Sequence, residues 1–292
     1  MSVPETITVF VPRDAAALAV GADKVAAAIE GEAKARNLDV HIVRNGSRGM
    51  LWLEVLVEVR TGQGRVAYGP VKASDVPSLF DAGFLTGGAH PLGHGLTKEI
   101  PFLKGQTRLT FARCGVTDPL SLEDYRHYQG LKGLEHAIAM APAEIVSQVT
   151  ESGLRGRGGA GFPTGIKWKT VADAKSDQKY IVCNADEGDS GTFADRMIME
   201  GDPFVLIEGM VIAGIAVGAT KGYVYTRSEY PHAIAIMEQA IEIARREGIL
   251  GPSVLGSAYA FDMEVRMGAG AYVCGEETSL LNSLEGKRGV VR

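Results

Sequence analysis

The chain has 292 residues, 46% of them hydrophobic and 22% charged, which is typical of a soluble globular protein with two domains. The net charge of −5 comes without any basic stripe, so nucleic acid is not an expected partner. Residues 1–6 are polar, and the longest apolar stretch, 204–219, is shorter than the ~20 residues that a membrane-spanning helix needs. We therefore expect a cytoplasmic protein with no signal peptide and no direct membrane insertion.

The first 117 residues are expected to form a small α/β domain. The patterns predict strands at 7–11, 40–43, 51–60 and 65–68, and helices at 15–36 and 76–82. The order β-α-β-β-β-α is typical of a thioredoxin-like domain. Its first strand–helix turn, 12–15, has no cysteine, so we expect a docking or structural role in place of thiol chemistry. Residues 85–115 contain several glycines and prolines and predict a loop-rich connector.

A second domain is expected over residues 118–292. A capping-box pattern at 121–124 predicts the start of its first helix. Further helices are predicted at 142–152, 204–219, 231–247 and 276–284, and strands at 180–184, 222–226 and 258–265. Strands that alternate with helices predict a Rossmann-like parallel sheet, whose ligands bind beyond the carboxyl ends of the strands.

The three cysteines, Cys114, Cys183 and Cys274, are odd in number and far apart. They fit neither a disulfide framework nor a CxxC metal motif. A [4Fe–4S] cluster needs four cysteine ligands, which this segment cannot supply by itself. We expect three small buried thiols and no metal site here.

The segment 153–168, GLRGRGGAGFPTGIKW, is the richest in glycine. Its glycines satisfy G-x-G-x-x-G, but a helix precedes the loop and Pro163 interrupts the helix that should follow, so it is no Rossmann fingerprint. Backbone without side chains can still approach a flat or anionic ligand closely. Arg155, Arg157 and Lys167 add positive charge that suits phosphates. A plain flexible loop is the alternative.

A predicted buried strand leads into the second segment, 180–193, YIVCNADEGDSGTF. One amide and three carboxylates follow it closely: Asn184, Asp186, Glu187 and Asp189. Ionised carboxylates accept hydrogen bonds from hydroxyl groups, so this loop could hold ribityl or ribose hydroxyls. A solvated acidic turn is the alternative.

The third segment is 267–282, MGAGAYVCGEETSLLN. Glu276 and Glu277 would open the last helix, where negative charge interacts favourably with the positive end of the helix dipole. Helix capping is one interpretation of this pair. The other is a site that grips a heterocycle and its hydroxyls, because a glycine-rich approach and Tyr272 precede the glutamates.

These three segments, in this order, closely resemble the flavoprotein subunit of complex I type NADH dehydrogenases, with relatives in NAD-reducing hydrogenases and NAD-dependent formate dehydrogenases. The resemblance covers about residues 119–292. The cysteine-free region in front, running into TRLTFARCG at 107–115, most resembles the beta subunit of NAD-dependent, molybdenum-containing formate dehydrogenase.

The resemblance implies that FMN is held by residues of all three segments. These are Gly156, Arg157, Gly158, Gly159, Lys167, Asn184, Asp186, Glu187, Gly188, Tyr272, Gly275, Glu276 and Glu277. It implies that NAD(H) stacks over the flavin and is bound by Phe162, Lys167, Asp189 and Glu277. Hydride would pass between nicotinamide and FMN without a side-chain base, so no catalytic residue is expected.

Two positions depart from the family pattern. Asp189 stands where the family often has glutamate, which implies a longer or water-mediated ribose contact. Thr170 stands where an aromatic residue often lies, which removes one adenine contact. The family continues beyond the position of Arg292 with a ubiquitin-like domain and a [4Fe–4S] domain, so we expect this chain to be part of a longer subunit.

The implied function is electron transfer between NAD(H), FMN and iron–sulfur clusters. The main interpretation is a formate dehydrogenase, which converts formate and NAD⁺ to CO₂ and NADH. NADH:quinone oxidoreductase or NAD-reducing hydrogenase is the alternative. Implied partners are an iron–sulfur subunit with a thioredoxin-like [2Fe–2S] domain and a larger catalytic subunit with iron–sulfur clusters, and a molybdenum cofactor in the formate dehydrogenase case. A phosphate-binding enzyme without redox chemistry and a flavin-free scaffold subunit stay open.

Overall fold

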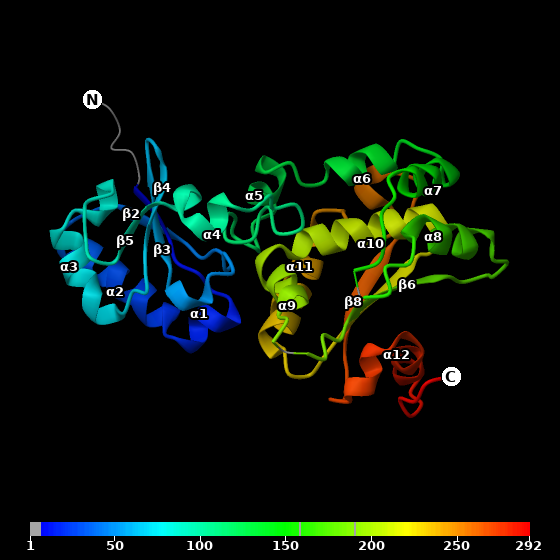
Figure 1. Cartoon of the computed structure of the whole chain (residues 1–292). Coiled ribbons are helices and arrows are strands. Elements are labelled where there is room, and N and C mark those ends of the chain that lie inside the picture. Colours follow the sequence, from blue (N-terminus) through cyan, green and yellow to red (C-terminus); the bar gives the residue numbers. More distant parts are fainter. Residues whose placement is uncertain (1–6, 158, 190) are drawn as a thin grey trace. The chain divides into compact units, whose positions relative to one another are not determined.

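The computed structural model describes residues 7–157, 159–189 and 191–292. The chain forms two compact units (Figure 1). The N-terminal unit comprises residues 1–121 and 200–202, and the C-terminal unit comprises 122–199 and 203–292. The predicted mixed α/β class with a parallel sheet is confirmed. The predicted domain boundary between residues 117 and 118 stays a prediction. So do the predicted thioredoxin-like nature of the first domain and the nucleotide-binding role of the second.

The N-terminal unit is built on a five-stranded sheet of order β2-β1-β3-β4-β5. Its strands are β1 (Ile7–Phe10), β2 (Val40–Val43), β3 (Val57–Thr61), β4 (Gly64–Tyr68) and β5 (Gly93–Leu96). β1 pairs in parallel with β2 and antiparallel with β3, and the β3-β4-β5 pairs are antiparallel. The thioredoxin-like assignment of this unit stays a prediction.

Helices cover the apolar faces of this sheet. Val9, Val57 and Val59 form one core with Ile29 of α2 (Ala22–Ala35) and Leu79 of α3 (Val76–Asp81). A second buried cluster contains Met50, Leu53, Leu56, Ala67, Ile100 and Leu103. Ala67 and Tyr68 are neighbours on β4 but belong to different clusters, because successive strand side chains point to opposite faces.

Three predicted elements of the N-terminal unit were wrong in extent. The single helix at 15–36 is two helices, α1 (Ala15–Ala19) and α2, because Gly21 between them has a left-handed φ of 100°. Residues 51–53 form a 3₁₀ turn, η1, ahead of β3, since Leu53 and Leu56 bury into the second cluster instead of alternating. The connector at 85–115 contains β5 and a short helix, α4 (Pro101–Lys104).

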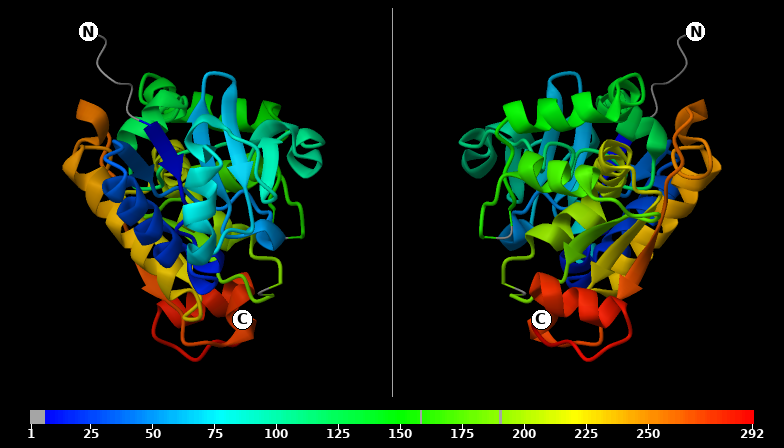
Figure 2. Two further views of the ribbon diagram at one scale, coloured as in Figure 1. Left: turned by 90° about the vertical axis from the view of Figure 1, so that its left-hand side faces the viewer. Right: turned by 90° about the vertical axis from the view of Figure 1, so that its right-hand side faces the viewer.

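The C-terminal unit contains a parallel sheet of order β6-β7-β8 (Figure 2). Its strands are β6 (Tyr180–Ala185), β7 (Lys221–Thr226) and β8 (Asp262–Met267), and all three are in register from end to end. The long apolar helix α10 (Pro203–Val217) packs against β6 and β7, and α11 (Pro231–Arg246) packs against β8. Gly222 allows this close approach, because a Cβ there would lie 3.0 Å from the Met210 side chain.

The remaining helices of this unit are α5 (Leu122–His127), α6 (Lys132–Ala137), α7 (Pro142–Glu151), α8 (Thr164–Asp173), α9 (Ala194–Gly201) and α12 (Glu277–Leu284). Of these, α6, α7 and α8 contact α10. Helices α6, α8 and α9 were not predicted from the sequence, and β8 was predicted to begin four residues early. Pro163 does not interrupt a helix: it is the N-cap residue of α8, just before the first turn, where proline is well tolerated.

A buried carboxylate on α10 forms hydrogen bonds with α5 and with the start of α6. Glu208, 8% exposed, accepts hydrogen bonds from the Tyr125 hydroxyl and from the backbone N–H groups of Leu131 and Leu134, both at 2.9 Å. Each hydrogen bond to a buried charge stabilises by roughly 1.5–3 kcal/mol. Within the described parts of the chain, no helix is both long and apolar enough to span a bilayer.

Candidate functional site

The three parallel strands of the C-terminal unit end together. Ala185 of β6, Thr226 of β7 and Met267 of β8 are paired in one row. The loops that follow, 186–193, 227–230 and 268–276, therefore start at one edge of the sheet. This is the edge at which open α/β sheets bind their ligands.

Direct contacts join the acidic loop to the segment before α12. The Asn184 amide donates to the Gly275 carbonyl at 2.8 Å. A Cβ on Gly188 would lie 2.7 Å from the Tyr272 ring, so the ring packs directly on that backbone. A Cβ on Gly275 would lie 3.1 Å from the Asp186 carbonyl. The second and third sequence segments, about 90 residues apart, are thus brought together.

The first glycine-rich segment folds back on itself. The Gly156 N–H donates to the Phe162 carbonyl and the Thr164 N–H donates to the Leu154 carbonyl, both at 2.9 Å. Gly159 at the tip has a φ of 98°, and a Cβ there would meet nothing within 4 Å. The tip therefore presents open backbone. Gly158, predicted to contact FMN, lies outside the described residues.

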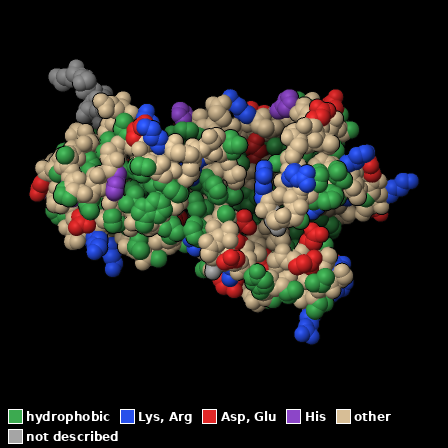
Figure 3. Space-filling model, viewed as in Figure 1, with side chains coloured by type: hydrophobic (Ala, Val, Ile, Leu, Met, Phe, Trp, Pro, Cys, Tyr) green, Lys and Arg blue, Asp and Glu red, His purple; other side chains and the backbone are tan. Residues whose placement is uncertain are grey.

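Lys167 on helix α8 links this loop to the third segment. The Lys167 ammonium lies 3.6 Å from the Glu277 carboxylate and 5.8 Å from the centre of the Phe162 ring. The Lys167 and Glu277 side chains are 57% and 75% exposed, so their pairing leaves both open to a ligand. Figure 3 shows acidic and basic side chains on the exposed surface between α8 and α12. Arg157 and Tyr272 are also exposed, Tyr272 to 77%.

The carboxylate of Glu187 is buried and hydrogen-bonded to groups of the protein itself. It accepts hydrogen bonds from the backbone N–H groups of Ala194, Asp195 and Arg196 at 2.7, 3.1 and 3.4 Å, where α9 begins. The Tyr230 hydroxyl donates to it at 3.0 Å. Burial, together with this negative neighbour, raises the pKa of Tyr230 to about 12. At 8% exposure, Glu187 is placed to shape the acidic loop.

The Arg227 side chain binds backbone carbonyl groups of the same acidic loop. Its guanidinium donates to the carbonyl oxygens of Glu187 and Gly188, the latter at 3.0 Å. It also pairs with Glu229 at 3.2 Å. Arg227 and Tyr230 were not among the predicted site residues, although they follow β7 at the same strand edge. They could have been predicted by considering the residues beyond the carboxyl ends of all three strands, where open α/β sheets bind their ligands.

The Glu276 side chain caps the N-terminus of α12. Its carboxylate accepts from the backbone N–H groups of Thr278 and Ser279 at 3.0 and 2.8 Å, and from the Thr278 hydroxyl at 2.7 Å. These bonds to the ionised form lower the pKa of Glu276 to about 2. The helix-capping interpretation thus describes Glu276, whereas Glu277 stays exposed.

The two remaining acids of the loop differ from each other. Asp186 is half-buried, and burial raises its pKa although the Arg227 guanidinium opposes the shift. Asp189 is exposed and accepts a hydrogen bond from the Gly191 N–H at 3.1 Å. Both retain carboxylate oxygens for a ligand that donates hydrogen bonds.

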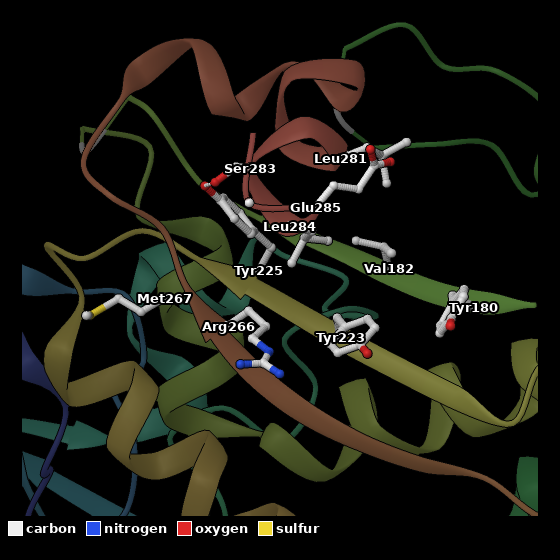
Figure 4. A pocket seen from close by; sticks show the side chains of 11 residues that line it. Tyr180, Val182, Tyr223, Tyr225, Arg266, Met267, Leu281, Ser283, Leu284 and Glu285 are labelled. Carbon is white, nitrogen blue, oxygen red and sulfur yellow. Dashed lines mark hydrogen bonds between the residues drawn. The ribbon is translucent and has the colours of Figure 1, made fainter. Parts of the chain in front are cut away.

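A hollow of about 580 Å³ lies beside these loops, on one face of the sheet. It is lined by Tyr180, Val182, Tyr223, Tyr225 and Arg266 from the strands and by Leu284 from the end of α12 (Figure 4). None of the predicted site residues that the structure describes lines it. The predicted site is therefore the loop cluster beyond the strand ends, and not this sheet face.

The sequence predicts three buried thiols, and the structure differs at one of them, because Cys183 is only half-buried. Cys114 and Cys274 are buried, and burial raises the pKa values of Cys114 and Cys183 to about 12. Such thiols are poor nucleophiles at neutral pH. Among the residues that the structure describes, no group of three His, Cys, Asp or Glu side chains is placed to hold a metal ion.

Comparisons with known proteins identify relatives of much of this chain. It is 55% identical over 186 residues to the NADP-reducing hydrogenase subunit HndC of Solidesulfovibrio fructosivorans, covering 64% of this chain and 38% of that protein. It is 52% identical over 192 residues to an NADH-quinone oxidoreductase subunit of Aquifex aeolicus, covering 65% and 45%. The chain thus spans less than half the length of either curated relative.

A solved structure resembles the whole chain. An NAD⁺-reducing [NiFe]-hydrogenase in the H₂-reduced state matches with a TM-score of 0.52 and 25% identity, over 100% of this chain and 48% of that one. Residues 149–292, which contain all three motifs and the strand edge where they meet, match the family described as the Nuo51 FMN-binding domain. This part of the chain belongs to that family, the flavoprotein family of complex I.

Proposed function

We propose that the chain is the FMN- and NAD(H)-binding part of a flavoprotein subunit that exchanges electrons between a nicotinamide nucleotide and iron–sulfur clusters. The observation that supports this most directly is the meeting of three motifs at the carboxyl edge of β6-β7-β8. The family match over residues 149–292 supports the same cofactor.

The residues present fit such a cofactor. FMN has a flat ring, hydroxyl groups and a phosphate. Open backbone at Gly159 suits a flat or anionic group, and exposed Arg157 and Lys167 suit the phosphate. Asp186 and Glu277 can accept hydrogen bonds from hydroxyl groups. The chemistry that bound FMN supplies is hydride exchange with a nicotinamide and one-electron exchange with clusters.

The protein's own part is to bind, orient and hold the loops. Phe162 and Tyr272 are exposed rings, 46% and 77%, on which heterocycles can stack. Arg227 and Glu187 fix the acidic loop through hydrogen bonds that need no ligand. We propose that Glu187 and Glu276 act through the backbone geometry that they stabilise, and that Asp186, Asp189 and Glu277 contact the nucleotides.

The complex to which the chain contributes is proposed from its relatives. HndC belongs to an NADP-reducing hydrogenase and the Aquifex aeolicus relative to an NADH-quinone oxidoreductase, so these two types are favoured over formate dehydrogenase. Formate dehydrogenase rests on the resemblance of the cysteine-free N-terminal region alone. Iron–sulfur partner subunits are expected in each case, and a molybdenum partner only in that of formate dehydrogenase.

Flavin binding tests the proposal. We expect the chain to quench FMN fluorescence on titration, and Lys167→Gln to weaken FMN binding about tenfold through the loss of one charge-assisted contact. Lys169→Gln is the matched control, because Lys169 is on the same helix, is 69% exposed and pairs with Asp173. Its FMN affinity should stay within twofold.

The competing functions predict other results. A flavin-free scaffold would show no quenching in either the wild-type chain or the variants. A phosphate-binding enzyme without redox chemistry would bind inorganic phosphate or a nucleotide as tightly as FMN, and added NADH would not bleach its flavin absorbance. Either result would overturn the proposal.

A further inference from the structure

A basic hollow lies within the N-terminal unit, in residues that none of the three motifs includes. It is lined by the cations Arg48, Arg65, Lys98 and Arg108, together with Thr97 and Gln106. These side chains come from the start of β4, from the turn after β5 and from the segments before η1 and after α4. The hollow has a volume of about 400 Å³, which is within the range of small-molecule sites.

Two of these cations, Arg48 and Arg65, form ion pairs with a buried carboxylate. Glu58 on β3 is fully buried and accepts from Arg48 Nη2 at 2.9 Å and from Arg65 Nη1 at 3.4 Å. Arg65 also donates to the carbonyls of Gly115 and Val116, at 3.1 and 2.5 Å. These bonds fix one wall of the hollow. Two of the four lining cations thus share the Glu58 carboxylate.

Arg108 lacks such compensation. Its guanidinium is half-buried and makes no hydrogen bond or ion pair with any residue that the structure describes. Burial lowers the pKa of Arg108; the Cys114 thiol opposes this shift, and the positive charge of Arg48 adds to it. A desolvated cation without a counter-ion is unfavourable. An anion in the hollow would remove that penalty.

A second polar group in the wall is unpartnered. Thr97 is 3% exposed, and its buried hydroxyl oxygen has no hydrogen-bond partner within the described ranges. Buried hydroxyls nearly always find a partner. Next to it, Lys98 is exposed and forms no ion pair within 4 Å in the described part of the chain. The hollow is therefore lined by Lys98 and Arg108, neither of which has an ion-pair partner among the described residues, and by Thr97, whose buried hydroxyl is unpartnered within the same ranges.

We propose that this hollow binds an oxyanion of the phosphate class, either inorganic phosphate or the phosphate group of a small ester. A planar guanidinium offers paired N–H donors that match two phosphate oxygens, and an ammonium adds a point charge. The site lies in the N-terminal unit and is independent of the proposed FMN site, so the failure of one proposal leaves the other standing.

Binding of inorganic phosphate to the full chain, measured by calorimetry at constant ionic strength with chloride, tests the proposal. Arg108→Gln and Lys98→Gln should each weaken binding about tenfold or more. Lys24→Gln removes the same charge from an exposed position on α2 that pairs with none of the described residues, and it should change affinity less than twofold. Arg108→Gln should fold normally, because Arg108 forms no hydrogen bond or ion pair with the described residues, and its melting temperature in chloride verifies this.

Further measurements separate the ligand sources and the two candidate sites. Tighter binding of glycerol 3-phosphate than of inorganic phosphate would identify an ester as the ligand, and the reverse order would identify the free ion. Lys169→Gln in the C-terminal unit, outside the proposed FMN contacts, should leave phosphate binding unchanged. Phosphate binding that survives both Arg108→Gln and Lys98→Gln, or is lost in Lys169→Gln, would overturn the proposal, as would no binding by the wild-type chain.

Discussion

An ion-pair cluster of the N-terminal unit and an ion pair of the C-terminal unit differ sharply in burial. In the N-terminal unit, Glu58 is fully buried and bound by Arg48 and Arg65, each side chain only 13% exposed. In the C-terminal unit, Lys167 and Glu277 lie 3.6 Å apart with more than half of each side chain exposed. A buried, saturated pair stabilises the fold as long as both partners remain. An exposed pair adds little stability and stays available to a ligand.

The largest expected effect follows from breaking the buried pair. Glu58→Gln should lower the free energy of unfolding by about 3–5 kcal/mol, since two buried guanidinium groups would lose their counter-ion. Urea denaturation of the full chain measures this. Glu99→Gln is the control, because Glu99 is 48% exposed and pairs with Lys104, so its unfolding free energy should stay close to that of the wild-type chain. Equal costs for the two variants would refute the distinction between buried and exposed ion pairs.

A pH effect of intermediate size is expected from Glu54. It is buried near Asp14 and accepts hydrogen bonds from the Ser47 hydroxyl at 2.9 Å and the Leu56 N–H at 3.1 Å. Burial, with repulsion from Asp14, raises the pKa of Glu54 from its ordinary 4.5 to about 7. The folded state therefore binds the proton more tightly than the unfolded state.

The stability contribution of Glu54 is present below pH 4.5 and is lost as the pH rises through 7. This loss amounts to about 3 kcal/mol at most. Glu54→Gln, which stays neutral, should flatten the pH dependence of the unfolding free energy between these values. A variant with the same slope as the wild-type chain would show that another group titrates.

The smallest expected effect concerns the acidic loop, where the C-terminal unit also has a buried carboxylate. Tyr230→Phe removes one hydrogen bond to Glu187 and should lower the unfolding free energy by about 1–2 kcal/mol. Because Glu187 positions the loop and does not touch the ligand in our proposal, FMN affinity should fall only a few-fold. Amide exchange at 186–189 should become faster, a readout that a remote structural change would not move.

Glu187→Gln sharpens this test. It keeps the shape and part of the hydrogen bonding, so FMN binding should persist with reduced affinity. Complete loss of FMN binding in a folded Glu187→Gln protein, with Tyr230→Phe unaffected, would indicate instead that the carboxylate contacts the flavin directly.

Much of the C-terminal unit could be predicted from the sequence. β6, β7, α10 and α11 agree with their predicted ranges within one or two residues, because long apolar or amphipathic runs define them. Helix α8 was missed because Pro163 and neighbouring glycines suggested a loop, although a proline just ahead of the first turn is compatible with a helix. In the N-terminal unit, β5 was missed because its Gly93-His94-Gly95 sequence lacks the β-branched residues of a typical strand.

The motifs and their chemistry were determined by the sequence itself. Glycines, cations and carboxylates in three segments were enough to indicate a nucleotide site, because these groups suit flat rings, phosphates and hydroxyls wherever the chain places them. Whether the Glu187 carboxylate is free was decided only by the tertiary structure, because its partner Tyr230 is 43 residues away. Glu276 caps its own helix, as one of the two sequence interpretations proposed, whereas Glu277 next to it stays exposed. A side chain's availability depends on partners that sheet register and burial bring to it, and local sequence does not contain that information.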